Sequence, residues 1–73
     1  MSQKIQLTWI GPENKTIIEE CYLISDDDVI YDTDTEPVLG AMEMMVKLDF
    51  VVFEDKDGIF CLHPKKIINI EML

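Results

Sequence analysis

Alternation of polar and apolar residues is the feature that most constrains the fold of this chain. In the segment Lys4-Ile5-Gln6-Leu7-Thr8-Trp9 every second residue is apolar. Successive side chains of a strand point to opposite faces, so this segment predicts a strand that buries one face. Residues 66–72 alternate in the same way and place Ile68, Ile70 and Met72 on one side. Both ends of the chain are therefore expected to contribute half-buried strands to a sheet.

Three further segments favour extended structure. Residues 16–24 follow the turn-forming residues 11–14 and are rich in β-branched side chains, which favours a strand. Thr16 and Glu19 also fit a helical capping box, so a helix is the alternative there. Residues 29–31 are a short strand candidate. Residues 50–53 and 59–62 flank an acidic turn that ends at Gly58, a pattern that predicts a hairpin with the glycine at positive φ.

One helix is expected between these strands. Thr35 is the predicted N-cap, Pro37 is tolerated in the first turn, and the helix should run to about Lys47. Glu43 and Lys47, four residues apart, are expected to face water. The predicted core-facing stripe is Val38, Ala41, Met42, Met45 and Val46. An adaptable binding groove is the alternative for the cluster Met42, Met44 and Met45, although packed core is the commoner use of such spacing.

These elements predict one small domain, residues 1–73, of the α+β class. We expect a small curled antiparallel sheet of about five strands with one helix. A chain of 73 residues encloses only a modest core, so self-association would add buried surface. Because an unpaired sheet edge can pair with its symmetry mate, we expect a homodimer.

Negative charge is concentrated in the middle of the chain. The chain has fifteen acidic residues and six lysines, which gives a net charge of −9. Residues 25–57 account for all of it, because the flanking segments cancel each other. Such a surface repels phosphates, so direct binding to nucleic acid is not expected.

The cysteines and the apolar stretches bear on location. Cys21 and Cys61 each lie in an apolar run, so both are expected to be reduced and buried. Neither a dense cysteine framework nor an N-terminal apolar signal segment is present, so we expect a cytoplasmic protein. The apolar stretches 38–42 and 50–53 are far shorter than the roughly 20 residues that span a bilayer, so no membrane anchor is expected.

The patterns that carry catalysis or hold cofactors are missing from the sequence. The single histidine, His63, precedes a proline at a predicted strand end, and no glycine-rich phosphate loop occurs. His63 and Cys61 would supply two of the four ligands of a structural zinc site. We therefore expect no enzymatic activity, no cofactor and no metal.

A calcium loop is the strongest metal alternative. Positions 1, 3, 5, 8 and 12 of an EF-hand-like loop are filled by Asp32, Asp34, Glu36, Leu39 and Glu43. The sixth position, where that loop needs glycine, is Pro37, whose φ is locked near −65°. An acidic loop that leads into a helix is the better interpretation.

The carboxylates themselves form the remaining pattern. In an extended segment, Asp32, Asp34 and Glu36 would point the same way about 6.6 Å apart. This spacing is comparable with the phosphate spacing along one DNA strand, about 3.4 Å of axial rise per nucleotide plus the winding of the backbone. The row would be extended by two flanking groups if the fold brings them together: Asp26, Asp27 and Asp28, and Glu54, Asp55 and Asp57. A solvated acidic face that aids solubility is the alternative.

The chain resembles a known group of proteins in several features. It is short and acidic, its positive charge comes from lysine, and it has two thiols and the segments Asp26-Asp27-Asp28 and Asp32-Thr33-Asp34-Thr35-Glu36. It is similar to the small DNA-mimic proteins that bacteriophages make to disable host DNA-binding proteins, and most similar in size and charge to those that inhibit the nucleoid protein HU. The resemblance implies a dimeric, non-enzymatic inhibitor that fills the basic DNA-binding cleft of an HU-like protein with carboxylates.

A different class of function is also compatible with the sequence. The chain would then be a small protein-interaction adaptor, for example on the host RNA polymerase, and would bind through an apolar patch. The exposed part of the methionine cluster is the candidate patch, and salt would have little effect on such binding.

Overall fold

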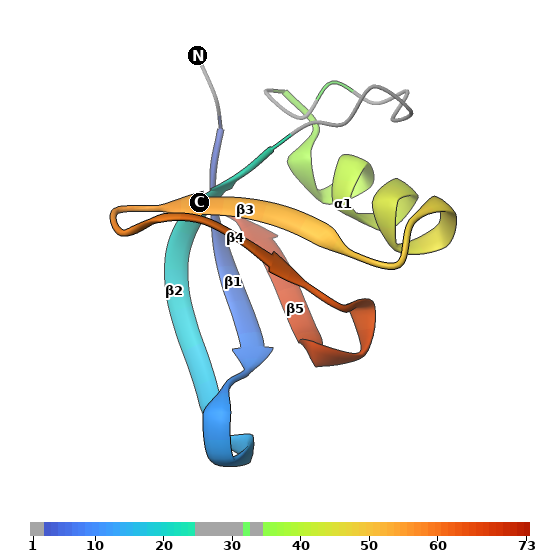
Figure 1. Ribbon diagram of the computed structural model, residues 1–73. Coiled ribbons are helices and arrows are strands. Elements are labelled where there is room, and N and C mark those ends of the chain that lie inside the picture. The colour runs from blue at the N-terminus through green and yellow to red at the C-terminus, as the bar shows by residue number, and fades with distance from the viewer. Residues whose placement is uncertain (1–2, 25–31, 33–34) are drawn as a thin grey trace.

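Residues 3–24, 32 and 35–73 are described in this computed structural model, and they form a five-stranded antiparallel sheet with one helix (Figure 1). The predicted α+β class is confirmed. The proposed strand at residues 29–31 lies outside the described residues. The elements are β1 (Lys4–Ile10), β2 (Thr16–Leu23), α1 (Pro37–Lys47), β3 (Val51–Asp55), β4 (Gly58–Leu62) and β5 (Ile67–Met72), with single 3₁₀ turns at Pro12–Asn14 and Pro64–Lys66.

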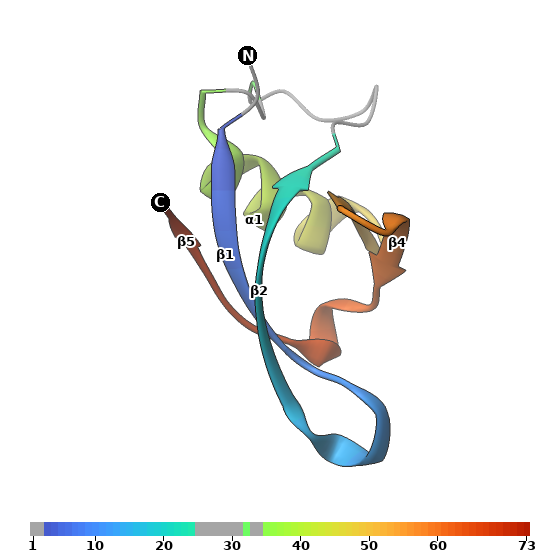
Figure 2. The same cartoon turned by 90° about the vertical axis from the view of Figure 1, so that its left-hand side faces the viewer.

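The sheet has the order β4-β3-β2-β1-β5, and every neighbouring pair is antiparallel. Strand β1 pairs along its whole length with β2, which confirms a strand at residues 16–23 over the helical alternative. Strand β3 pairs with β2 only at Tyr22↔Glu54 and Leu23↔Phe53, so the two strands diverge beyond that point. The sheet therefore curls, and β4 swings over the inner face of the curl (Figures 1 and 2).

The core lies between the inner face of the sheet and α1. Period-two alternation places the buried strand residues in phase: Ile5 and Leu7, Cys21 and Leu23, Val51 and Phe53, and Leu62. Phe53 is completely buried, and its ring stacks on Phe60 with centroids 5.5 Å apart. Trp9 packs at the margin of this core, 6.1 Å from the same Phe60 ring. The predicted buried face of β1 is confirmed.

Helix α1 has the predicted range but not the predicted cap. Its N-cap is Glu36 rather than Thr35, and the cap side chain makes no capping hydrogen bond. The Thr35 hydroxyl instead donates to the backbone oxygen of Asp32 at 3.5 Å, within a turn that precedes the helix. Pro37 occupies the first helical position, where its missing N–H costs nothing.

The buried face of α1 was only partly predicted. Pro37, Gly40, Ala41 and Met44 face the sheet at spacings of three and four residues. The predicted members Met42 and Val46 are 56% and 87% exposed instead, because the small residues 40 and 41 bring a neighbouring side of the helix against the strands. Glu43 was expected to face water, but its side chain is only 8% exposed and accepts a hydrogen bond from Lys47 Nζ at 2.7 Å.

The β3–β4 hairpin is confirmed, with Gly58 at φ 128°. Leu62 and Phe60 point inward on β4, so Cys61 points outward on an edge strand and is exposed. The prediction that Cys61 is buried is therefore wrong, whereas Cys21 is buried as expected.

The buried face of strand β5 differs from the predicted one. A β-bulge between Thr8 and Trp9 shifts the register, so Ile67 rather than Ile68 packs against the core beside Ile70. Ile68 turns outward in consequence, and Met72 is half exposed at the sheet edge. Within the described residues, no helix combines the length and the apolar character needed to cross a lipid bilayer.

Candidate functional site

Acidic side chains gather where β3 diverges from β2. A surface hollow of about 700 Å³ opens there, and five of the described carboxylates line it together with Lys4 and Lys56. We call it the acidic hollow. Its carboxylates are Glu19 and Glu20 of β2, Glu54 and Asp55 of β3, and Asp57 of the hairpin turn. In Figure 1 the β3–β4 hairpin crosses β2, and its turn projects beyond that strand. The crossing brings together these five residues, which come from two separate segments of the chain.

Local structure holds the hairpin carboxylates in place. The backbone N–H of Asp57 donates to Asp55 Oδ1 at 2.8 Å, and Gly58 supplies the positive φ that closes the turn. Glu54 lies on the outer face of β3 and is exposed, whereas Asp55 is in phase with the buried Val51 and Phe53 and points to the inner side. The two adjacent carboxylates therefore face opposite sides of the hairpin.

The lysines neutralise only part of the acidic hollow. Lys4 Nζ lies 3.6 Å from Glu20 Oε1 and 5.8 Å from the centroid of the Tyr22 ring, so its charge is engaged on the outer face of β1 and β2. Among the described residues, Glu19, Glu54, Asp55 and Asp57 form no ion pair with a lysine or histidine within 4.0 Å. The site therefore keeps a strong negative charge.

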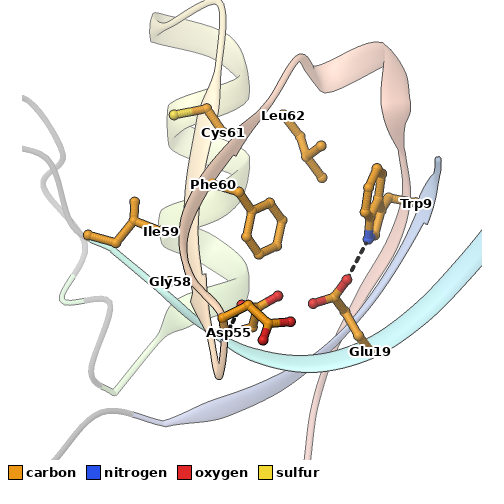
Figure 3. Close-up of a pocket in the computed structure, with 9 residues that line it drawn as sticks. Trp9, Glu19, Asp55, Gly58, Ile59, Phe60, Cys61 and Leu62 are labelled. Atoms are coloured by element: carbon orange, nitrogen blue, oxygen red, sulfur yellow. Dashed lines mark hydrogen bonds between the residues drawn. The ribbon is translucent and has the colours of Figure 1, made fainter. Parts of the chain in front are cut away.

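Glu19 and Asp55 form the centre of this site. Trp9 Nε1 donates a hydrogen bond to Glu19 Oε2 at 3.0 Å (Figure 3). Burial raises the pKa of Glu19 above its usual value; the indole hydrogen bond lowers it, and the nearby Asp55 raises it further. The pKa of Asp55 is lowered, chiefly by a hydrogen bond from the Glu19 side chain and by its backbone bond from Asp57. Of the two acids, Glu19 therefore binds a proton more readily than Asp55.

A second, smaller pocket lies behind this pair on the inner side of the hairpin. It has a volume of about 310 Å³ and shares Glu19, Asp55 and Asp57 with the acidic hollow. We call it the inner pocket. Figure 3 shows Trp9, Phe60 and Leu62 along its apolar wall and Glu19 and Asp55 at its polar end, whereas Ile59 and Cys61 point away.

Only some of the predicted partner-binding residues lie together in the structure. Glu54, Asp55 and Asp57 lie together at the acidic hollow. Asp32 and Glu36 are exposed near the start of α1, where the backbone N–H of Glu36 donates to Asp32 O at 2.7 Å, and neither residue lines the hollow. The other predicted members, Asp26, Asp27, Asp28 and Asp34, lie outside the described residues.

Sequence reasoning missed Glu19 and Glu20, although a signal for Glu19 was present. Ile17, Glu19, Cys21 and Leu23 share one face of β2, so the alternation places a carboxylate in line with buried residues. Asp55 bears the same relation to Val51 and Phe53. A carboxylate in phase with the apolar face of a strand indicates an inward-pointing acid at the margin of a core.

Cys21 borders the acidic hollow and Cys61 borders the inner pocket, whereas His63 lines neither. Burial, followed by the nearby charges of Glu19 and Asp55, raises the pKa of Cys21 to about 12 and keeps it a thiol. The imidazole Nδ1 of His63 accepts a hydrogen bond from the backbone N–H of Lys65 at 3.1 Å. Within residues 3–24, 32 and 35–73, no three His, Cys, Asp or Glu side chains are grouped so as to hold a metal ion.

Comparison with known proteins yields no relative: no family model matches this chain, and neither a curated protein nor a solved structure matches it. The functional argument therefore depends on the geometry and charge of the site.

Proposed function

We propose that this protein is a non-enzymatic DNA mimic that binds the basic DNA-binding cleft of another protein and excludes DNA from it. The observation that carries the proposal is the acidic hollow, where five carboxylates from two segments surround one surface with two lysines among them. A basic cleft built to hold phosphates presents the complementary charge. The net charge of −9 would accelerate the encounter with such a cleft by long-range attraction.

The preferred partner is an HU-like nucleoid protein of a bacterial cell, encountered in the cytoplasm. Support for this choice comes from the likeness in size and charge to the phage inhibitors of HU, described above. The projecting hairpin turn with Glu54 and Asp57 is the part of the site that would enter a cleft first.

A gel-shift competition tests this function. Purified HU is bound to a short duplex DNA, and this protein is titrated in at about 50 mM and about 500 mM salt. We expect displacement of DNA at the lower salt and a steep loss at the higher, because exposed charges are screened beyond about 10 Å at 0.1 M and about 3 Å at 1 M. HU that stays on the DNA at a large excess of this protein at low salt would contradict the HU assignment.

Paired charge variants locate the binding surface. The double variant Glu54→Gln with Asp57→Asn removes two exposed carboxylates from the acidic hollow. The matched control, Glu13→Gln with Glu71→Gln, removes the same charge from the β1–β2 turn and from β5. We expect the first variant to weaken competition at least ten-fold and the control to change it much less. Equal weakening would mean that net charge alone, rather than this surface, drives binding.

One observation favours a second candidate, the adaptor that binds through an apolar patch. Leu39, Met42 and Val46 are exposed on one side of α1, and Phe50 is exposed just beyond the helix. This patch would bind a partner such as the host RNA polymerase with little dependence on salt. Binding to purified polymerase that survives 500 mM salt and is lost in Val46→Glu, but not in the Glu54 and Asp57 variant, would favour the adaptor.

We also propose that the protein acts as a homodimer. Strands β4 and β5 are the two edges of the described sheet, and Ile59 and Ile68 are exposed on them. Sedimentation equilibrium at micromolar concentration should give twice the 8.5 kDa chain mass. A single 8.5 kDa species at every concentration would refute the dimer.

A further inference from the structure

The inner pocket has a composition that the acidic surface alone does not explain. Its wall is formed by the aromatic rings of Trp9 and Phe60, whose centroids are 6.1 Å apart, and by the buried side chain of Leu62. Two carboxylates, Glu19 and Asp55, close one end of it (Figure 3). Aromatic faces beside carboxylates form a suitable environment for an organic cation, which is attracted by the ring quadrupole as well as by the negative charge.

The carboxylate pair lacks a cation in the fold itself. No lysine or histidine of the described residues lies within 4.0 Å of Glu19 or Asp55, and the nearby charges are the acid Asp57 and the flanking Lys56. The indole N–H of Trp9 satisfies one oxygen of Glu19 and orients that carboxylate across the pocket. The side chains of Glu19 and Asp55 are hydrogen-bonded to each other, and a bound cation would favour the form in which both are ionised.

We propose that the inner pocket binds the guanidinium group of one arginine side chain from the partner protein. This inference rests on the proposed function, since it names the group of the basic partner that the site recognises. A guanidinium is planar, donates in a fork that matches carboxylate oxygens and stacks on aromatic rings, whereas an ammonium is a compact, strongly hydrated point charge. The volume of about 310 Å³ lies at the lower limit of small-ligand pockets, which suits a single side chain.

The partner's arginine would enter with its charged end between Glu19 and Asp55 and its aliphatic stem against Phe60. Its guanidinium would donate to Asp55 and to Glu19 in place of the hydrogen bond between the two acids, and Glu19 would retain the indole hydrogen bond of Trp9. The outer carboxylates Glu54 and Asp57 contribute long-range attraction, so the pocket adds selectivity to a surface that otherwise attracts any cation.

Trp9 is the only tryptophan of the chain, so it is a specific probe of the pocket. N-acetyl-arginine amide is titrated into the ¹⁵N-labelled protein at constant ionic strength, and the Trp9 indole N–H resonance is followed. We expect a saturable shift with a dissociation constant on the order of millimolar, as suits one side chain. N-acetyl-citrulline amide, the neutral analogue of similar shape, should give no saturable shift, and N-acetyl-lysine amide should bind at least several-fold more weakly. No shift with arginine, or an equal shift with citrulline, would overturn the proposal, and equal binding of lysine would overturn the assignment to guanidinium.

Neighbouring residues of one strand give a matched pair of variants. Asp55→Asn removes a charge from the inner pocket, and Glu54→Gln removes the same charge from the opposite face of β3. We expect arginine binding to fall at least ten-fold in Asp55→Asn and to change less than two-fold in Glu54→Gln. Equal effects of the two variants would refute the pocket.

The same variants separate this inference from the proposed function. Displacement of HU from DNA that is as strong with Asp55→Asn as with the wild-type protein would support the DNA mimic and refute the arginine pocket. Saturable arginine binding with no displacement of HU would support the pocket and refute the HU partner.

Discussion

Phe53→Ala should be the most damaging single substitution in the hairpin that carries the candidate site. Phe53 is completely buried, stacks on Phe60 at 5.5 Å, and pairs with Leu23 at the short junction between β2 and β3. Truncation of a buried phenylalanine to alanine costs about 3 to 5 kcal/mol. A domain of 73 residues has a free energy of unfolding of about 4 to 11 kcal/mol at ~0.05 to 0.15 kcal/mol per residue, so this variant loses a large part of the total.

Urea unfolding, followed by circular dichroism and Trp9 fluorescence, measures this effect. At an m-value of about 1 kcal/mol/M, the midpoint should fall by about 3 to 5 M. Phe53→Leu keeps more of the buried volume, so it should remain folded and lose less if the alanine variant does not fold. Ile59→Ala is the control, because Ile59 lies in the same hairpin but is 65% exposed, and its cost should stay within about 0.5 kcal/mol. An alanine at position 53 that costs no more than one at position 59 would show that the hairpin is not held through this core.

Three further predictions concern single groups near the site. Gly58→Ala should lower stability by about 1 to 3 kcal/mol in thermal unfolding, because a residue with a side chain is strained at φ 128°. The cost comes from the backbone alone, since no atom lies within 4 Å of the added Cβ. Unchanged stability would mean that the turn adopts another conformation. Ellman's reagent should modify exposed Cys61 rapidly and buried Cys21, whose pKa is raised to about 12, only slowly, and Cys61→Ser should abolish the rapid phase. Because the pKa of Glu19 is raised, the folded state holds the Glu19 proton more tightly than the unfolded state does. The protonated Glu19 therefore stabilises the fold at pH values below its usual pKa near 4.5, and this stabilisation is lost as pH rises through the raised pKa. Glu19→Gln should therefore raise Tm relative to wild type at pH 7 but not at pH 4, and an equal difference at both pH values would refute the pH argument.

The sequence predicted those acidic residues of the site that lie close together in the chain, and it missed those that only the fold brings near. Glu54, Asp55 and Asp57 belong to one hairpin whose turn is specified by the acidic loop and Gly58, so their proximity follows from adjacent residues. The approach of Glu19 to Asp55 depends on where β3 stops pairing with β2, which is a property of the curled sheet. Nothing in residues 16–23 alone indicates that a strand from residues 51–55 will diverge there.

The strands, the helix range and the hairpin were determined by the sequence itself, because they depend on period-two alternation, on Pro37 at a helix start and on a glycine at positive φ. Which side of a strand or helix is buried required the tertiary structure. Because of a bulge beside Trp9, Ile67 packs against the core in the place predicted for Ile68. Close packing of α1 buries Met44 and leaves Met42 and Val46 exposed. Such choices depend on how far each element rotates against its neighbours, and that rotation is set by the packing of residues distant in the chain. The inner pocket has the same origin, since its wall and its carboxylates come from β1, β2 and the β3–β4 hairpin and meet only when the sheet curls.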